Sequence, residues 1–494
     1  MWVWRIALFR AIFIREGIEA IVPHGTSVLE AARICGVYLE SPCNGNGTCG
    51  KCKVIISGET VLACETALCC DTEITTLKSQ SDSRTLKILS GGSSLEYSLK
   101  PRFNVGYGLA ADIGTTTLVV SLINLSTGEE EASESLLNPQ TQYAQDVLSR
   151  IQFAEDAQGL DTLYEALTQA LNEAIRRLAA RVGITTGEIK DAVYSGNTTM
   201  LHLAVMADPS PLGKYPYTPV ISGGQYFDAE RLDIGGKIYL PPIISAFVGA
   251  DITSGILASE LSKTTAATLF IDIGTNGEMV LAKDGKLVAT STAAGPAFEG
   301  MNISQGIRAS NGAIERFSMS DDDTFEFETI GDTEAIGICG SGLLDIAAEL
   351  VRTGRIGKTG RFSDKSREFR ITDKVAITQN DIRQLQLAKG AVRTGIDAML
   401  KNRDLTHESI ERVEIAGSFG YHLSERSLLN LKLLPEAFEG KVSFVGNTSQ
   451  SGGIAFLLNT DLRREAESIV KEVESIELAD DDGFQKLFVS SLGF

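Results

Sequence analysis

Four cysteines near the start of the chain have the spacing of an iron–sulfur site. Cys43, Cys49 and Cys52 lie in a glycine-rich loop, and Cys64 follows a predicted strand and turn, which gives the pattern C-x5-C-x2-C-x11-C. A cluster needs four thiolates that converge on it, and glycines let the backbone wrap so that amides point at the sulfides. Plant-type sites have C-x4-C-x2-C, so the first gap here is one residue longer. We expect these four thiols to ligate a [2Fe-2S] cluster.

Two other interpretations of these thiols stay open. Structural zinc sites usually combine two C-x2-4-C pairs, whereas one such pair is present here, and the thiols could also be unligated. Seven of the eight cysteines lie within the first seventy residues, which is more typical of a metal site than of a disulfide framework. We expect the other three in this region, Cys35, Cys69 and Cys70, to be small core residues.

A short motif occurs twice, 160 residues apart, and its chemistry is that of phosphate binding. Residues 109–117 and 269–277 each contain D-I-G-T after an apolar strand, and a strand, a turn and a return strand follow. Such a hairpin offers backbone N–H groups and threonine hydroxyls to an anion, and an aspartate to a metal ion. One copy would be weak evidence, because Asp-Ile-Gly also forms ordinary turns. Two copies in matching contexts predict two related halves.

A third glycine-rich turn is predicted to contribute to the same site. Residues 413–416 form a predicted buried strand, and the sequence G-S-F-G at 417–420 turns into a predicted helix over 423–431. Such a turn lets the backbone lie against a base or a ribose. We also expect residues 194–200 and 247–251 to end strands, at the rim of a cleft between the two predicted halves.

Composition and charge exclude several classes of protein. The chain has 494 residues, too many for one compact core, and its 45 basic against 64 acidic residues give a net charge of -19. This charge opposes non-specific binding to nucleic acid and to anionic membranes. The apolar start is interrupted by Arg5 and Arg10, and no segment approaches eighteen uncharged apolar residues. We expect no nucleic-acid partner, no membrane segment and a cytoplasmic location. The four histidines lack metal-ligand spacing, so we expect surface or core roles for them.

The combination of these motifs resembles a known family. The D-I-G-T pair with I-A-G-S-F-G is similar to the ATPases of the acetate and sugar kinase, Hsc70 and actin superfamily. With a ferredoxin-like domain ahead of it, the chain resembles the reductive activators of corrinoid enzymes. Other stretches similar to that family are N-P-Q at 138–140, G-N-T-T-M at 196–200, A-G-P-A-F-E-G at 294–300 and G-I-C-G-S-G at 337–342.

The resemblance implies a multi-domain architecture. An α+β, β-grasp ferredoxin-like domain is expected at residues 1–78 and a linker at 79–105. An α/β ATPase domain of two RNase H-like halves, as in actin, Hsp70 and sugar kinases, is expected at 106–265 and 266–494. Because the stretch between the domains is short, we expect this chain to lack a middle domain that larger relatives carry.

The residues and the resemblance together predict a site for ATP and Mg²⁺. Asp112 and Asp272 are expected to face each other across the cleft and to hold Mg²⁺, largely through water. The residues expected to bind phosphate are Gly114, Thr115, Thr116, Thr117, Gly274, Thr275 and Asn276. Those expected to border adenosine are Gly417, Ser418, Phe419 and Gly420.

The function implied by the resemblance is ATP-dependent reduction of an inactive Co(II) corrinoid to Co(I). The partner would be the corrinoid protein of a methyltransferase system, and an upstream donor would supply the electrons. Two alternatives stay open: a small-molecule kinase with a fused redox domain, and an electron carrier whose nucleotide site only gates docking. The sequence also leaves open whether the chain forms a homodimer.

Overall fold

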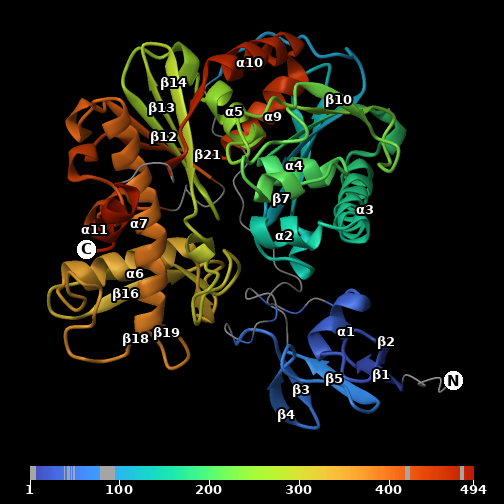
Figure 1. The fold of residues 1–494 in the computed structure, drawn as a ribbon, viewed down its shortest axis with the longest axis vertical. Helices are drawn as coiled ribbons and strands as arrows, with labels where there is room; N and C mark the ends of the chain where they lie inside the picture. The colour runs from blue at the N-terminus through green and yellow to red at the C-terminus, as the bar shows by residue number, and fades with distance from the viewer. Residues whose placement is uncertain are drawn as a thin grey trace. The chain divides into compact units, whose positions relative to one another are not determined.

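The computed structural model describes residues 7–37, 39, 41, 45, 47, 50–77, 95–417, 423–478 and 483–494. Two of the expected cluster ligands, Cys43 and Cys49, and three expected adenosine residues, Ser418, Phe419 and Gly420, lie outside them. The chain divides into two compact units, shown in Figure 1: unit 1 comprises residues 1–84 and 139–153, and unit 2 comprises 85–138 and 154–494.

Unit 1 is built on a five-stranded sheet in the order β2-β1-β5-β3-β4. The Ser27 hydroxyl accepts a hydrogen bond from the Glu30 backbone N–H and caps α1, whose apolar side packs with Phe13, Val22 and Ile74. The parallel pairing of β1 with β5 brings the two ends of this segment together, as expected of a β-grasp domain. The elements are β1 (Leu8–Phe13), β2 (Ile18–Pro23), α1 (Val28–Ile34), β3 (Lys53–Ile56), β4 (Glu59–Leu62), β5 (Thr72–Thr76) and, later in the chain, α2 (Val147–Phe153).

The first half of unit 2 is a six-stranded sheet in the order β10-β11-β9-β6-β7-β8. Strands β6, β7 and β8 form an antiparallel meander, while β9 and β11 run parallel to β6. Its elements are β6 (Tyr107–Ile113), β7 (Thr117–Asn124), β8 (Glu130–Leu137), α3 (Ala157–Val182), β9 (Ile189–Gly196), α4 (Thr198–Ala204), β10 (Gln225–Asp228), β11 (Lys237–Leu240) and α5 (Ala250–Ala258).

The second half repeats this arrangement in the order β21-β20-β12-β13-β14-β22. Again three strands form an antiparallel meander and two strands run parallel to the first of them. The predicted duplication of two RNase H-like halves is therefore confirmed. The strands are β12 (Thr268–Ile273), β13 (Gly277–Lys283), β14 (Lys286–Thr292), β20 (Arg412–Ala416), β21 (Val442–Gly446) and β22 (Glu474–Ser475).

A smaller layer of helices and short strands extends the second half. Its sheet has the order β16-β15-β17, and β18 pairs with β19 in a hairpin that leads into the long helix α7. The elements are β15 (Ala313–Met319), β16 (Phe325–Thr329), β17 (Gly337–Ile338), α6 (Gly340–Arg352), β18 (Glu368–Arg370), β19 (Ala376–Thr378), α7 (Gln379–Asn402), α8 (Glu425–Asn430) and α11 (Phe484–Ser491). Two further helices, α9 (Thr448–Leu458) and α10 (Thr460–Glu472), follow β21 and lie outside this layer.

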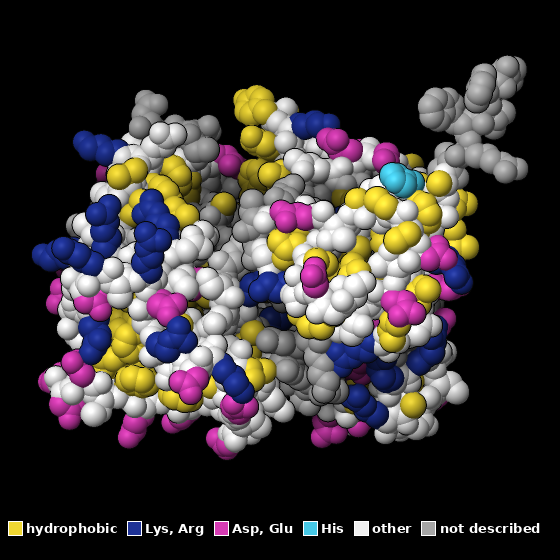
Figure 2. Space-filling view, turned by 90° about the horizontal axis from the view of Figure 1, so that it is seen from below, with side chains coloured by type: hydrophobic (Ala, Val, Ile, Leu, Met, Phe, Trp, Pro, Cys, Tyr) yellow, Lys and Arg dark blue, Asp and Glu magenta, His cyan; other side chains and the backbone are white. Residues whose placement is uncertain are grey.

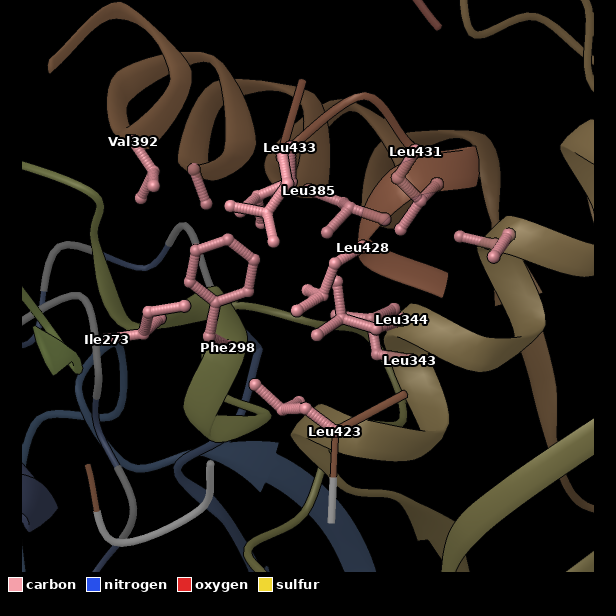
Figure 3. Close-up of a cluster of buried hydrophobic side chains, with 14 of the residues drawn as sticks. Ile273, Phe298, Leu343, Leu344, Leu385, Val392, Leu423, Leu428, Leu431 and Leu433 are labelled. Carbon is pink, nitrogen blue, oxygen red and sulfur yellow. The ribbon is translucent and has the colours of Figure 1, made fainter. Parts of the chain in front are cut away.

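The core of the second half surrounds Phe298, which is fully buried in the 3-10 helix η5 (Pro296–Glu299). Figure 3 shows its ring between side chains of α6 and α7, including Leu344, Leu385 and Val392. Because such interiors are close-packed, η5 cannot shift without a shift of these two helices. This contact matters for the site, since the next residue, Glu299, faces the cleft.

Two crossing helices connect the halves of unit 2. Helix α9 follows β21 of the second half but packs against β6 and β9 of the first. It also crosses α5 so closely that a Cβ on Gly452 would lie 2.3 Å from the backbone oxygen of Ser254. Glycine is therefore required at this crossing, and the two halves meet through the helices that begin at the cleft.

The end of the predicted linker is bound to unit 2 along the part that the structure describes. Leu95 and Tyr97 pack against the apolar side of α9 and α10, and the Asn459 amide donates a hydrogen bond to the Ser98 carbonyl. Lys100 forms an ion pair with Asp461 at 2.9 Å. The expectation of a tether therefore fails from residue 95 onward, because these side chains bury apolar surface. Within the described residues, no helix has the length and apolar character needed to cross a membrane.

Candidate functional site

The two D-I-G-T motifs come together at one cavity between the halves of unit 2. Asp112 lies near the end of β6 and Asp272 near the end of β12, and both line a cavity of about 120 Å³. Every described residue predicted for the ATP site also lines it: Gly114, Thr115, Thr116, Thr117, Gly274, Thr275, Asn276 and Gly417. Asn197 and Asp251 of the two expected rim segments line it as well. The lining residues without a predicted role are Val119, Ile273, Glu278, Glu299, Asn447 and Ser449.

Tight hairpins place the first and second motif at the cavity. The Gly114 N–H donates to the Thr117 carbonyl at 3.0 Å, and the Gly274 N–H donates to the Asn276 carbonyl at 2.9 Å. A Cβ on Gly114 would lie 2.5 Å from the Thr117 oxygen, so the first turn needs glycine. These hairpins leave the threonine residues next to open space, where hydroxyls and backbone N–H groups are suited to phosphate oxygens.

The third glycine turn lies against the second motif. Strand β20 pairs in parallel with β12, which brings Gly417 beside the end of that strand. Gly417 has φ +115°, and a Cβ there would lie 2.8 Å from the Ile273 carbonyl and 3.1 Å from Asp272 Oδ1. A side chain would therefore strain the turn and press on the aspartate. The predicted strand over 413–416 and the following helix are confirmed.

Asp112 is held by residues that lie more than three hundred positions later in the chain. Its Oδ2 accepts a hydrogen bond from the Asn447 amide at 2.9 Å, and its Oδ1 accepts one from the Ser449 hydroxyl at 2.8 Å. Burial raises the pKa of Asp112, and these two hydrogen bonds oppose that shift. Asn447 and Ser449 belong to the start of α9, so the helix that joins the halves also orients the carboxylate of the first motif.

Four carboxyl groups, of which Glu278 is buried and the other three are half-buried, concentrate negative charge at the cavity. Burial, together with the charge of Asp112, raises the pKa of Asp272 to about 7. The pKa of Asp251 is raised by burial and by Asp272 and Asp112, and that of Glu278 by burial and by Asp251 and Asp272. A cation bound here would relieve the repulsion and favour the ionised forms. The carboxylates therefore fit a site for a metal ion with bound phosphate.

The described residues do not form a metal site from protein ligands alone. Among the residues that the structure describes, no three His, Cys, Asp or Glu side chains are arranged to hold a metal ion. Mg²⁺ commonly keeps several waters and takes one or two carboxylates together with phosphate oxygens. The two carboxylates at the cavity, Asp112 and Asp272, fit that mode of binding.

The predicted rim segments differ in their outcome. Strand β9 does end at residue 196, and the amide of Asn197, which caps α4, donates to the Thr115 hydroxyl at 2.9 Å. The expected strand end at residues 247–251 is wrong, because β11 ends at Leu240 and α5 begins at Ala250. A proline-rich loop separates the strand from the helix there, and Pro disfavours continued strand pairing. Asp251 nevertheless reaches the cavity from the first turn of α5.

In the cluster loop of unit 1, the described residues fit a thiolate site. The Cys52 and Cys64 sulfur atoms lie 3.3 Å apart. Gly45, Gly47 and Gly50 have positive φ, which lets the loop fold back on itself. A Cβ on Gly47 would lie 2.4 Å from a carboxylate oxygen of Glu65. The two converging thiols beside this loop fit half of the four-thiolate ligand set of a [2Fe-2S] cluster, and Cys43 and Cys49 lie outside the described residues.

The expectation for the other early cysteines is wrong in two of three cases. Cys69 and Cys70 are exposed, whereas Cys35 is partly buried against the unit 1 core. The apolar stretch before Cys69 ends at Leu68, which is buried, so the next two residues turn to solvent. Burial raises the pKa of Cys35, which keeps it protonated at neutral pH.

His202 has a core role, as expected, and its geometry predicts a pH dependence of stability. Its Nδ1 donates to the Thr198 carbonyl at 2.7 Å, and its Nε2 accepts the backbone N–H groups of Val220 and Ile221. Burial lowers its pKa, so the folded protein keeps this imidazole neutral. Below about pH 6.5 the unfolded chain binds a proton that the folded chain does not, and stability falls as the pH falls.

This prediction is tested by thermal unfolding of the wild type and of His202→Gln at pH 7.5 and pH 5.5. The glutamine carbonyl can still accept a backbone N–H but does not titrate. The melting temperature should fall more steeply with acid in the wild type than in the variant. Equal slopes would contradict the assignment of a neutral, accepting imidazole.

Comparison with known proteins matches almost the whole chain. Residues 266–494 match the C-terminal domain of RACo, described as the ASKHA domain, and residues 107–264 match the RACo middle region. Residues 12–75 match the 2Fe-2S iron-sulfur cluster binding domain. The expectation that this chain lacks a middle domain is therefore wrong, because the region of that name corresponds to the first half of unit 2.

Individual relatives support the same assignment. The chain is 32% identical to the corrinoid activation enzyme RamQ of Eubacterium limosum over 419 residues, which are 78% of this chain and 70% of that protein. It is 24% identical to a [Co(II) methylated amine-specific corrinoid protein] reductase of Methanosarcina barkeri, over 78% of this chain and 77% of the other. A solved structure of a reductive activator for corrinoid, iron-sulfur protein aligns over 98% of both chains, with 30% identity and a TM-score of 0.73. The chain thus belongs to the RACo family of reductive activators, with an N-terminal 2Fe-2S ferredoxin domain and a following ASKHA domain.

Proposed function

We propose that this protein uses ATP to reduce the inactive Co(II) corrinoid of a partner corrinoid protein to Co(I). The observation that carries the proposal is the presence on one chain of a thiolate loop and of a carboxylate-lined cleft between two D-I-G-T hairpins. Relatives named for corrinoid activation and for corrinoid protein reduction support the choice of substrate.

The cleft would bind Mg²⁺ and ATP. Asp112 and Asp272 would hold the metal ion through its water, while the two hairpins would donate N–H and hydroxyl groups to the phosphates. Gly417 and the turn after it would border the adenosine. Asn447 and Ser449 would keep Asp112 oriented. Because both residues lie at the start of α9, a movement of Asp112 when the halves close on the nucleotide would also move that end of the helix.

The thiolate loop would supply the electron. When bound, a [2Fe-2S] cluster of this type provides one electron at a reduction potential of about -400 mV. Moving one electron uphill costs about 2.3 kcal/mol per 100 mV. A deficit of a few hundred millivolts is within the free energy that nucleotide binding and hydrolysis provide, if partner contacts differ between nucleotide states. Each reduced chain would pass one electron to Co(II), and an upstream donor would restore it.

An anaerobic assay with candidate substrates tests this function against the kinase alternative. Prereduced protein with MgATP should convert a Co(II) corrinoid protein of a methyltransferase system to Co(I), followed by its visible spectrum. ATP consumption should rise with that protein and should not rise with sugars or small carboxylic acids. ATP consumption that responds to a sugar or an acid and ignores every corrinoid protein would favour the kinase.

The upstream electron donor, the formation of a homodimer and the cytoplasmic location remain predictions.

A further inference from the structure

One segment of this acidic protein is strongly basic. Residues 352–383 contain nine Lys or Arg against four Asp or Glu, in a chain whose net charge is -19. Figure 2 shows Lys and Arg side chains gathered on the left part of the face seen from below, where the second half of unit 2 lies. Because the rest of the chain is acidic, this segment is an exception that a solubility role does not explain.

Five cations of this segment are exposed and unpaired. They are Lys358, Arg361, Lys365, Arg367 and Arg383, and within the described residues none forms an ion pair. The other four basic residues have acidic partners, such as Glu349 for Arg352 and Glu334 for Lys374. We call these five residues the basic face.

Three hydrogen bonds hold the loop of the basic face at the start of α7. The Gln379 amide donates to the Gly360 carbonyl at 2.7 Å, and the Gln386 amide donates to the Thr359 carbonyl at 3.2 Å. The Gln379 backbone N–H donates to the Arg367 carbonyl at 2.8 Å. The loop over 357–367 is thus fixed against the first two turns of α7, one of which carries Arg383. The loop that carries the first four of these charges therefore lies beside the helix turn that carries the fifth.

The same turn of α7 is connected to the nucleotide cavity. Thr275 of the second D-I-G-T motif donates a hydrogen bond to Glu299 of η5. The loop after η5 is bound to α7, because the Ser304 backbone N–H and hydroxyl donate to Asp381 Oδ1 at 2.7 and 2.9 Å. Asp381 lies two residues before Arg383, and Phe298 is packed against the same helix (Figure 3). A shift of Thr275 with the γ-phosphate would therefore be passed to the basic face.

We propose that the basic face docks an acidic patch on the corrinoid protein, and that its position depends on the bound nucleotide. This inference rests on the function proposed above. Five unpaired cations on one loop and the adjoining helix turn suit a brief encounter between two proteins, in which charge sets the association rate and orientation. Since the remainder of the chain repels an acidic partner, this face would also select one orientation. Nucleic acid is the less suitable occupant, because strong binding there needs more phosphate contacts than five cations provide.

Charge reversal with a matched control tests the inference. The test variant is Lys358→Glu, Arg361→Glu and Arg367→Glu combined. The control reverses three exposed lysines elsewhere on unit 2, Lys283→Glu, Lys286→Glu and Lys471→Glu, and changes the net charge equally. Binding is measured with the Co(II) corrinoid protein that the Co(I) assay identifies, with and without MgATP, at 50 and 200 mM salt. Thermal unfolding and the ATP hydrolysis rate without partner should be the same in both variants.

The test variant should raise the Kd for the corrinoid protein at least about tenfold at 50 mM salt and should lose most of the salt dependence. The control should stay within about twofold of the wild type. Equal Kd values for the two variants would overturn the assignment of the basic face as the docking site and would leave the proposed function intact. Failure of the wild type to bind or reduce any corrinoid protein would overturn both. Loss of binding to a DNA duplex, with corrinoid protein binding unchanged, would assign this face to nucleic acid instead.

Discussion

Replacing Asp272 with asparagine should lower ATP hydrolysis at least about 100-fold and leave the visible spectrum of the iron–sulfur cluster unchanged. The asparagine keeps the size of the side chain but removes a carboxylate that lines the cavity where Mg²⁺ is expected. Losses of about 100-fold or more are common when one such electrostatic group is removed from a reaction centre. The measurement is phosphate release at saturating MgATP, together with the absorbance of the anaerobically purified variant.

Asp284→Asn is a suitable control for this variant. Asp284 is exposed in the β13–β14 turn of the same half, where its φ of +51° is tolerated by asparagine. The Asp284→Asn variant should hydrolyse ATP at the wild-type rate. Normal turnover in Asp272→Asn would remove this carboxylate from the site, whatever the control does.

Replacing Cys64 with alanine should abolish the cluster. The wild type should contain two irons per chain and absorb in the visible range, whereas Cys64→Ala should lose both, because three thiolates do not complete the expected ligand set. Cys35→Ala and Cys69→Ala should keep the iron and the spectrum. Iron content and absorbance after anaerobic reconstitution are the measurements. Zinc in place of iron in the reconstituted wild type, or full iron in Cys64→Ala, would contradict the assignment.

The parts of the fold that local sequence patterns predict are the repeated ones. The two D-I-G-T motifs occur in the same order of strands and turns, so a duplicated sheet followed from their repetition, and the structure confirms it. Each motif is also a self-contained hairpin, which explains why Asp112, Asp272 and the neighbouring glycines could be assigned to one cavity. The strand before Gly417 was predictable for the same reason, since its apolar run and its turn are adjacent in sequence.

The contacts between distant segments could not be predicted in this way. Asn447 and Ser449 reach Asp112 because α9 crosses back to the first half, and no pattern near residue 447 encodes that partner. Glu299 likewise joins the cavity through the packing of η5 against α6 and α7. The bound end of the linker and the exposure of Cys69 depend likewise on tertiary contacts, which override local propensity.

The central claim is that nucleotide drives an electron transfer that is otherwise uphill. A ligand can shift this equilibrium only if the partner is held differently in the two nucleotide states. An electron carrier whose nucleotide site only gates docking would produce the same amount of Co(I) without ATP hydrolysis. A non-hydrolysable ATP analogue would therefore support the same yield as ATP. The two accounts therefore differ in the amount of Co(I) at a fixed donor potential.

The most direct test measures Co(I) by its absorbance after prereduced protein is mixed anaerobically with the Co(II) corrinoid protein at one donor potential. Three conditions are compared: no nucleotide, MgATP, and Mg²⁺ with a non-hydrolysable analogue. The account predicts that most of the corrinoid stays Co(II) without nucleotide and that MgATP yields Co(I) up to the electrons supplied. Asp272→Asn should stay at the level without nucleotide. Full Co(I) formation without nucleotide would contradict ATP coupling, and equal yields with ATP and the analogue would leave the electron-carrier account standing.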